Sequence, residues 1–192
     1  MKILSYNMRT WWRDPLGVAI KRYKAIKNYI IDINPDIICT QELVPPFNWC
    51  IPRGYKKASI GLFEHPVYIK QNLKVLWKKN FTYRGVAVCV TDGYETYVII
   101  NVHSHWDMVK HVEDMHYVQR CINTYKKVIA TGDFNVEPKD SVMKEYITDG
   151  GYTFVNKQGY KATLDYAVTE MNVKVYVGEI GDSDHAPIVI YS

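Results

Sequence analysis

The sequence lacks the features that mark several large classes of protein. Its 192 residues hold 11 glycines and 8 prolines with no period, which excludes a collagen-like or low-complexity chain. No run approaches about 18 consecutive apolar residues, so no membrane span is expected. The first residues lack the apolar core and small-residue cleavage site of a secretory leader, and we therefore expect a cytoplasmic protein.

Cysteine is scarce as well, with four residues in the whole chain and none at the spacing of a zinc finger. Cys39 and Cys89 fall inside strand-like apolar runs, where a free thiol behaves as a small hydrophobe. Without a secretory leader, reduced cysteines are favoured over a disulfide framework.

What the sequence does contain is typical of an ordinary globular domain. It is 47% hydrophobic, 14% aromatic and 23% charged, which argues against disorder. No repeat, linker or break in composition divides the chain, so residues 1–192 are expected to form a single domain. We take a monomer as the default.

The net charge of +4 is unevenly distributed along the chain. Residues 1–96 hold 15 basic and 7 acidic residues, whereas residues 97–192 hold 9 and 13. The basic residues gather beside aromatic ones at 21–24, 53–57 and 74–79. Such segments suit a phosphate backbone with stacked bases. On charge alone, a solvated helix face and loop tips are the favoured explanation.

Strand and helix patterns alternate along the sequence. Apolar residues at helical spacing predict helices at 18–33 and 108–125. A short helix is expected at 141–147, capped by Asp140 or Ser141. Strands are expected at 3–6, 36–41, 85–90, 96–103, 127–131, 164–168, 173–177 and 188–190, with 67–69 and 73–77 as further candidates. Asp92-Gly93 predicts a hairpin. This pattern indicates an α/β fold with mixed sheets and helices outside.

Polar residues follow or begin many of these strands, at positions that an α/β fold brings together in one cleft. They are Asn7, Gln41, Glu42, His103, Ser104, His105, Asp133, Asn135, Asp165, Asp184 and His185. A single strand-end Asn or Asp is usually turn chemistry. So many strand ends of this kind in one small chain point to a site instead.

This set of residue types suits cleavage of a phosphate ester. A phosphodiester is already negative, so a hard divalent cation held by oxygen ligands, Mg²⁺ with Mn²⁺ as an alternative, would neutralise the developing charge. Glu42 is the simplest principal ligand. An aspartate would orient or deprotonate the attacking water, and asparagine amides and a histidine would donate hydrogen bonds to the phosphoryl oxygens.

Five short segments resemble the ordered motifs of the endonuclease/exonuclease/phosphatase superfamily, and together they span nearly the whole chain. They are SYN at 5–7, TQE at 40–42, GDFN at 132–135, LDY at 164–166 and SDHAP at 183–187. The resemblance implies a four-layer α/β (α+β) sandwich of the deoxyribonuclease I type. In that fold two mixed β-sheets pack face to face with helices outside.

The resemblance also implies roles for the residues that match these motifs. Asn7 matches an asparagine that contacts the metal site and the phosphate. Glu42 matches the metal-binding glutamate, and Asp184 a second carboxylate of the metal site. Asp133 and Asn135 match the pair that positions the nucleophile and the phosphate.

The remaining matches concern histidines. His185 matches the catalytic histidine, and Asp165 the aspartate that orients it. His103 resembles the second catalytic histidine of the deoxyribonuclease I branch. In that branch an arginine two residues after the first asparagine meets DNA phosphate, which implies phosphate contact by Arg9. A surface salt bridge is the alternative for Arg9.

The chain also departs from that branch. A glutamate orients the second histidine there, and the nearest candidate here is Glu64, which aligns poorly. The region between Glu42 and Arg84 is compressed, and the disulfides of secreted members are not apparent. Trp11-Trp12 suits stacking on a base or burial under the sheet edge. We expect His111 and His116 on a solvent-facing helix.

The resulting expectation is a Mg²⁺-dependent phosphodiesterase that hydrolyses nucleic acid, foremost a DNA endonuclease, with DNA favoured over RNA. One alternative is an enzyme that cleaves small phosphoesters, phosphoinositides or phosphotyrosyl-DNA ends. A second is a binding module that keeps the fold and binds nucleic acid without catalysis.

Overall fold

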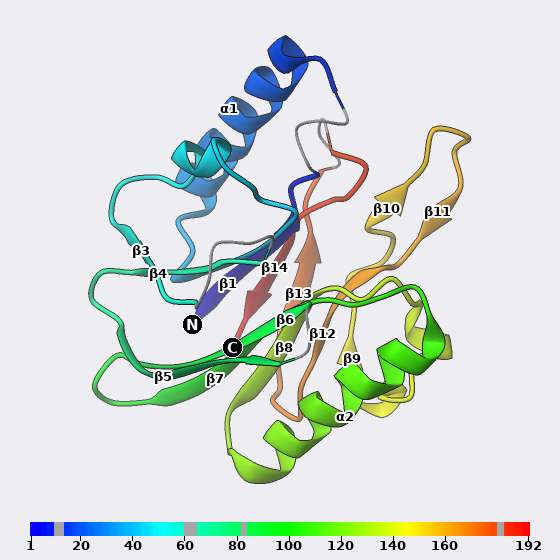
Figure 1. The fold of residues 1–192 in the computed structure, drawn as a ribbon. Coiled ribbons are helices and arrows are strands. Elements are labelled where there is room, and N and C mark those ends of the chain that lie inside the picture. Colours follow the sequence, from blue (N-terminus) through cyan, green and yellow to red (C-terminus); the bar gives the residue numbers. More distant parts are fainter. Residues whose placement is uncertain (10–13, 60–64, 82–83, 180–182) are drawn as a thin grey trace.

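Two six-stranded sheets pack face to face in the computed structural model, which describes residues 1–9, 14–59, 65–81, 84–179 and 183–192. The first sheet has the order β13 (Lys174–Val177), β14 (Ile188–Tyr191), β1 (Lys2–Asn7), β2 (Ile37–Gln41), β4 (Val67–Lys70) and β3 (Tyr55–Lys57). The second has the order β5 (Lys74–Phe81), β6 (Gly85–Thr91), β7 (Thr96–His103), β8 (Val128–Asp133), β12 (Asp165–Val168) and β9 (Ile147–Thr148). A small hairpin of β10 (Phe154–Val155) and β11 (Lys161–Ala162) projects beside them (Figure 1).

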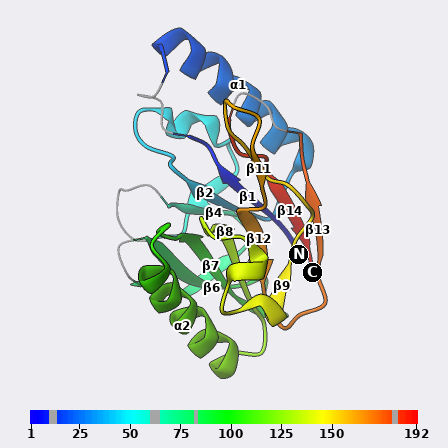
Figure 2. The same ribbon diagram turned by 90° about the vertical axis from the view of Figure 1, so that its right-hand side faces the viewer.

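One long helix covers the outer face of each sheet (Figure 2). Helix α1 (Leu16–Ile33) connects the parallel strands β1 and β2, and α2 (Met108–Thr124) connects the parallel strands β7 and β8. Asn34, in a left-handed conformation, ends α1, and Asp107 caps α2 by accepting hydrogen bonds from two backbone amides of its first turn. Both helices lie within about two residues of their expected bounds.

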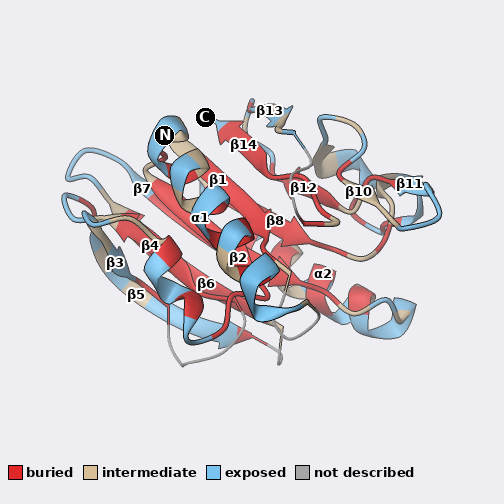
Figure 3. Cartoon of the chain, turned by 90° about the horizontal axis from the view of Figure 1, so that it is seen from above, coloured by how far each residue is buried: buried red, intermediate tan, exposed pale blue. Residues whose placement is uncertain are grey.

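The core is divided into layers that match this architecture. One apolar cluster fills the space between the sheets, a second lies under α2 and a third under α1. The central strands are buried on both faces, which explains their almost continuous apolar sequences (Figure 3). The expected four-layer sandwich is therefore confirmed. No helix in the described part of the chain has the length and apolar character needed to cross a bilayer.

The short helix expected at 141–147 is not present. The segment instead holds the 3₁₀ turns η3 (Pro138–Asp140) and η4 (Lys144–Tyr146), and its end belongs to β9, which pairs with β12. Ser141 Oγ does accept the backbone amide of Met143, so this hydroxyl caps a turn rather than a helix. A helix of two turns has little stability of its own, and pairing with β12 prevails. A further 3₁₀ turn, η2 (Phe47–Cys50), packs against α1.

One prediction about α2 is wrong, because His111 is fully buried rather than exposed to solvent. The buried residues of α2 recur three or four positions apart from His111 to Ile122, and His111 lies on that stripe. His116 lies on the opposite face and is exposed, as expected.

Candidate active site

Strand pairing brings the polar strand ends to one edge of the sandwich. In the first sheet Asn7 lies beside Gln41, the residue before Glu42. In the second sheet Asp133 lies between His103 on β7 and Asp165 on β12. Because the carboxyl ends of the parallel pairs β1–β2 and β7–β8 meet at this edge, residues far apart in the sequence share one site.

The backbone turns sharply just beyond these strands. Arg9, Glu42 and Asn135 adopt φ angles of 53°, 57° and 54°, in the left-handed region that non-glycine residues rarely occupy. Gly132 has a φ of 145°, and a Cβ there would lie 1.9 Å from the carbonyl oxygen of Val102 on the neighbouring strand. Glycine is therefore required immediately before Asp133.

Asp133 is the centre of the site, and it is almost completely buried. Its Oδ2 accepts a hydrogen bond of 2.9 Å from Asn7 Nδ2, which also lies 3.4 Å from Glu42 Oε1. Its Oδ1 accepts the backbone amide of Asn135 at 3.0 Å. The Asn7 amide thus joins the two carboxylates that the sequence assigned to metal binding and to activation of the nucleophile.

His185 lies on the other side of Asp133 and is held by Asp165. Its Nδ1 is 2.8 Å from Asp165 Oδ2, and its Nε2 is 3.7 Å from Asp133 Oδ2. Thr153 Oγ1 fixes the start of β12 by accepting the backbone amide of Asp165. With Nδ1 directed at Asp165, Nε2 is the ring nitrogen that faces the site.

The electrostatics of this pair favour a charged imidazole. Burial by itself lowers the pKa of His185, but the carboxylates of Asp165, Asp133 and Asp184 outweigh it and raise the pKa to about 10. Burial also raises the pKa of Asp165, a rise that His185 opposes. The pair holds its proton on His185, because Asp133 and Asp184 add negative charge on the imidazole side.

His103 approaches the same carboxylates from β7. Its Nε2 lies 3.5 Å from Asp133 Oδ2 and 4.0 Å from Glu42 Oε1. The ring packs edge-on against His65 at a centroid distance of 5.1 Å. Its Nδ1 is buried and has no hydrogen-bond partner among residues 1–9, 14–59, 65–81, 84–179 and 183–192. Glu64, the sequence-based candidate for that partner, lies outside the described residues.

The remaining expected residues lie around this centre. Asn135 Nδ2 donates to the carbonyl oxygen of Ser104 at 3.0 Å. Asp184 is half-buried beside His185. The Arg9 guanidinium forms an ion pair with Asp14 at 3.3 Å, which is the alternative that the sequence left open for it. Trp11-Trp12 lies outside the described residues.

The donor set fits a hard divalent cation. The four carboxylates of Glu42, Asp133, Asp165 and Asp184 outnumber the two imidazoles beside them, and Glu42 and Asp133 are buried where negative charge is costly. Asp133, Asp165 and His185 offer ligand atoms within 4.8 Å of one another. Because Asp165 and His185 are hydrogen-bonded to each other, the oxygens around Asn7 and Glu42 are the better donors.

Sequence reasoning missed the polar support between the sheets. Gln41 Nε2 donates to Asn101 Oδ1 at 2.6 Å, and Asn101 Nδ2 donates to the carbonyl oxygens of Thr40 and His65 at 2.9 and 3.0 Å. We call these contacts the Asn101 clasp. The available signal was a single asparagine inside the apolar run of β7, at a position buried on both sides.

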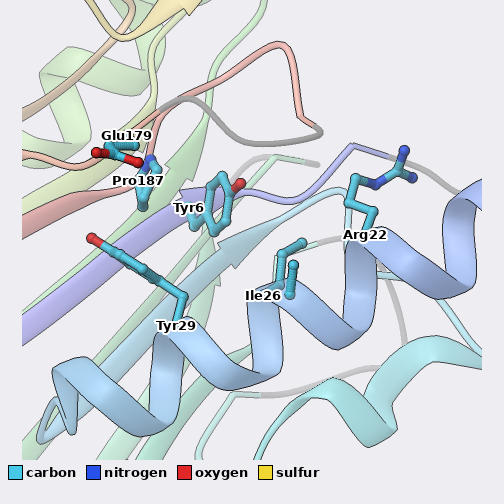
Figure 4. A pocket seen from close by; sticks show the side chains of 7 residues that line it. Tyr6, Arg22, Ile26, Tyr29, Glu179 and Pro187 are labelled. Carbon is cyan, nitrogen blue, oxygen red and sulfur yellow. The ribbon is translucent and has the colours of Figure 1, made fainter.

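A mostly apolar cavity lies elsewhere. It has a volume of about 260 Å³ and is lined by Tyr6, Arg22, Ala25, Ile26, Tyr29, Glu179 and Pro187, between α1 and the first sheet (Figure 4). Successive side chains of a strand point to opposite faces, so Tyr6 faces this cavity and Asn7 faces Asp133. The cavity is therefore on the other side of the sheet from the site.

Comparison with known proteins identifies the family. Residues 19–185 match the sequence model of the endonuclease/exonuclease/phosphatase family. The chain belongs to this family. Its members are in general hydrolases of phosphate esters and typically depend on a divalent metal ion. No curated protein sequence matches the chain.

Solved structures share this fold. An endonuclease/exonuclease/phosphatase family protein from Bacteroides thetaiotaomicron is 18% identical, with a TM-score of 0.77 over 99% of this chain and 96% of that one. TDP2 from Caenorhabditis elegans is 18% identical, with a TM-score of 0.76 over 99% and 73%. D. rerio TDP2 complexed with a single-strand DNA product is 16% identical, with a TM-score of 0.72 over 99% and 97%.

Proposed function

We propose that the chain is a divalent-metal-dependent phosphodiesterase that cleaves nucleic acid, with DNA favoured over RNA. One observation carries this proposal: a buried aspartate, Asp133, is bonded to Asn7 and lies within 4 Å of Nε2 of both His103 and His185. A proton acceptor and two proton donors in one cleft suit in-line attack of water on a phosphodiester.

The metal ion is proposed as Mg²⁺, with Mn²⁺ as an alternative, held by Glu42, Asn7 and Asp184. When bound, it would neutralise the charge that develops on the phosphate. The excess of carboxylates over cations in the described site supports this assignment.

The protein's own residues would move the protons. Asp133 would orient the attacking water and accept its proton at the carboxylate. His185, protonated at Nε2 and held by Asp165 at Nδ1, would donate a hydrogen bond to a phosphoryl oxygen. His103, also facing the site through Nε2, would protonate the leaving oxygen. Asn135 would contribute its amide to the phosphate. Arg9 would add a further phosphate contact only by exchanging its ion pair with Asp14 for the phosphate.

Two observations support nucleic acid as the substrate. The first half of the chain carries a basic excess, and phosphate contacts dominate affinity for nucleic acid. A structural relative, D. rerio TDP2, is solved with a single-strand DNA product. The non-catalytic alternative is disfavoured because a binding module has no need for the carboxylate and histidine set around Asp133.

The test is cleavage of supercoiled plasmid and of labelled single-stranded DNA and RNA, with Mg²⁺, with Mn²⁺ or with chelator. We expect metal-dependent cleavage that falls at least about 100-fold in His185→Ala and Glu42→Gln. His116→Ala is the matched control, because His116 is an exposed histidine on the outer face of α2. Cleavage of bis(p-nitrophenyl) phosphate alone would overturn the nucleic-acid substrate, and no cleavage of either by folded protein would overturn the enzyme.

A further inference from the structure

Two basic segments that are far apart in the sequence lie together on one side of the sandwich. Strand β3 is the last strand of the first sheet, β5 is the last strand of the second, and both lie on the same side (Figures 1 and 3). These strands and the turn before β3 expose six cations and no acidic side chain. We call this set the basic edge: Arg53, Lys56, Lys57, Lys74, Lys78 and Lys79.

The two strands direct like charges toward the gap between the sheets. Lys56 pairs with Ile69 and Lys78 pairs with Val88, and both of these apolar partners belong to the core between the sheets. Paired residues of neighbouring strands share a face, so Lys56 and Lys78 project from the inner faces of the two edge strands. A surface lined by one sign of charge raises the local concentration of ligands of the opposite charge, such as phosphates.

Lysines on an edge strand also prevent sheets from pairing edge to edge. The other edge strands of this molecule carry far fewer cations, so protection against such pairing does not require the number of lysines found on β3 and β5. Strand β13 exposes one lysine, Lys174, and the edge strand β9 consists of Ile147 and Thr148 alone. The density of cations on β3 and β5 therefore exceeds what edge protection uses elsewhere in the described chain.

The basic edge leads to the active site. The end of β5 pairs with the start of β6 at Gly85, and Gly85 pairs with Val102, the residue before His103. The backbone amide of His103 donates to the carbonyl oxygen of Arg84 at 2.8 Å. Lys78 pairs with Val88, which pairs with Ile99, four residues before His103. Lys78 therefore lies about 10 Å across the sheet and about 13 Å along the strand from His103, a separation of a few nucleotides.

We propose that the basic edge binds the phosphate backbone of the nucleic acid that flanks the cleaved bond, with Lys56 and Lys78 at its centre. This inference rests on the proposed function, whose substrate it extends beyond the reacting phosphate. It also locates the basic excess of the first half of the chain, because segments 53–57 and 74–79 together form the basic edge. In segment 21–24, by contrast, Arg22 and Tyr23 lie on the buried face of α1.

The test measures binding without cleavage, so it does not depend on the reaction. The affinity for a labelled single-stranded oligodeoxynucleotide is measured in chelator as a function of salt. The variants are Lys56→Gln/Lys78→Gln and, as a control of equal charge, Lys126→Gln/Lys174→Gln, two exposed lysines at the end of the strands away from the active site. We expect the first pair to weaken binding about tenfold and to reduce the salt slope by about 1, and the control to change neither.

Hydrolysis of bis(p-nitrophenyl) phosphate separates this inference from the proposed function. Both double variants should retain wild-type rates on this small diester, which is too short to reach the basic edge. Equal losses of oligonucleotide affinity in the two pairs would overturn the inference, even if the chain is a nuclease. The inference would also be overturned if the first pair of substitutions abolished binding to phosphatidylserine vesicles and left the oligonucleotide affinity unchanged, because the basic edge would then bind a membrane surface.

A second, independent observation concerns the buried polar residues of α2. Asp114 Oδ2 accepts a hydrogen bond of 2.7 Å from Ser104 Oγ. His111 lies 3.4 Å from the same hydroxyl through Nδ1 and 3.3 Å from Ser141 Oγ through Nε2. These four polar residues are buried and touch the two loops that follow β7 and β8.

These contacts reach Asn135 through Ser104. The carbonyl oxygen of Ser104 accepts Asn135 Nδ2, and its backbone amide donates to the carbonyl oxygen of Asp133 at 2.8 Å. The serine is not a nucleophile, because it is fully buried and gives its proton to Asp114 rather than to His111. We infer that Asp114 and His111 are positioning residues, which hold Ser104 and thereby orient the amide of Asn135 in the proposed reaction.

The test compares Asp114→Ala with the conservative Asp114→Asn and with Thr169→Val, which removes a buried hydroxyl bond at the other end of β12. We expect Asp114→Ala to lower kcat about 10–100-fold with little change in KM, Asp114→Asn to restore most of it, and Thr169→Val to leave kcat unchanged. In an Asn135→Ala background Asp114→Ala should have no further effect on kcat. Equal effects in both backgrounds would overturn the inference.

A signal that needs no activity keeps this second inference testable if the chain is not an enzyme. The side-chain amide of Asn135, assigned by its loss in Asn135→Ala, should exchange slowly in wild type because it is bonded to Ser104. Faster exchange in Asp114→Ala supports the positioning role, and unchanged exchange contradicts it.

Discussion

Replacing Asn101 by leucine would test how the two sheets are joined beneath the active site. Leucine fills a similar volume but can neither accept from Gln41 nor donate to the carbonyl oxygens of Thr40 and His65. Three groups that are bonded in the wild type would then be buried without these partners. Asn101 is completely inaccessible, so water does not replace the lost bonds without opening the sheets.

The expected cost follows from those three groups. Each unsatisfied buried group costs about 1–3 kcal/mol, which gives about 3–6 kcal/mol after allowing for the bond that Gln41 keeps to Ser5. A domain of this size has about 5–15 kcal/mol of stability, so the loss would be large. Urea unfolding followed by circular dichroism would measure it, with Thr169→Val, expected to cost about 1 kcal/mol, as the control for loss of one buried bond.

A double variant makes the reasoning refutable. Removing both partners of a buried bond is less costly than removing one, so Gln41→Leu should destabilise the Asn101→Leu protein less than it destabilises wild type, by about 1–2 kcal/mol. If Asn101→Leu alone costs less than about 1 kcal/mol, or if the two changes are additive, the Asn101 clasp does not hold the sheets together.

Further predictions concern titration, thiols and backbone strain. In metal-free protein His185 should titrate near pH 10 by NMR, and its pKa should fall in Asp165→Asn. The stability that the proton on His185 confers is complete below about pH 6.5 and is lost as the pH rises through about 10. Burial lowers the pKa of His111, so as the pH drops this histidine is protonated in the unfolded chain before it is protonated in the folded protein. The free energy of unfolding should therefore fall below about pH 6.5. It should fall less in His111→Gln, as measured by urea unfolding at each pH. All four cysteines are buried free thiols, and Ellman's reagent should label them only after unfolding; rapid labelling of native protein would contradict the packing. Gly132→Ala should give little folded protein, because its Cβ would lie 1.9 Å from Val102 O; a soluble, active variant would show that the strands shift freely.

The sequence predicted which polar residues gather at this edge better than it predicted the contacts that support them. Asn7, Glu42, Asp133 and His185 each stand at the end of a recognisable apolar strand, and parallel strands carry such ends to a common edge. The positions of these residues at strand ends in the sequence were therefore enough to predict that they lie close together in the structure. The short strands β3 and β9–β11 went unpredicted, because two or three residues show no period.

The burial of His111 shows the opposite case. A histidine on a helix usually lies at the polar surface. His111 can be buried only because it has the polar partners Ser104, Asp114 and Ser141. Those partners come from α2 and two separate loops, so no local pattern marks them. Asn101 was hidden in the same way, since its bonding partners lie on the other sheet.

The left-handed turns at Arg9, Glu42 and Asn135 have a consequence for how this chain would respond to selection. Each conformation costs the fold about 1–2 kcal/mol that glycine would not incur. A library sorted for thermal resistance alone should therefore enrich glycine at these three positions and lose the chemistry of the cleft in the same step. These three residues at the rim of the cleft are therefore retained for the roles of their side chains, although their backbone conformations favour glycine.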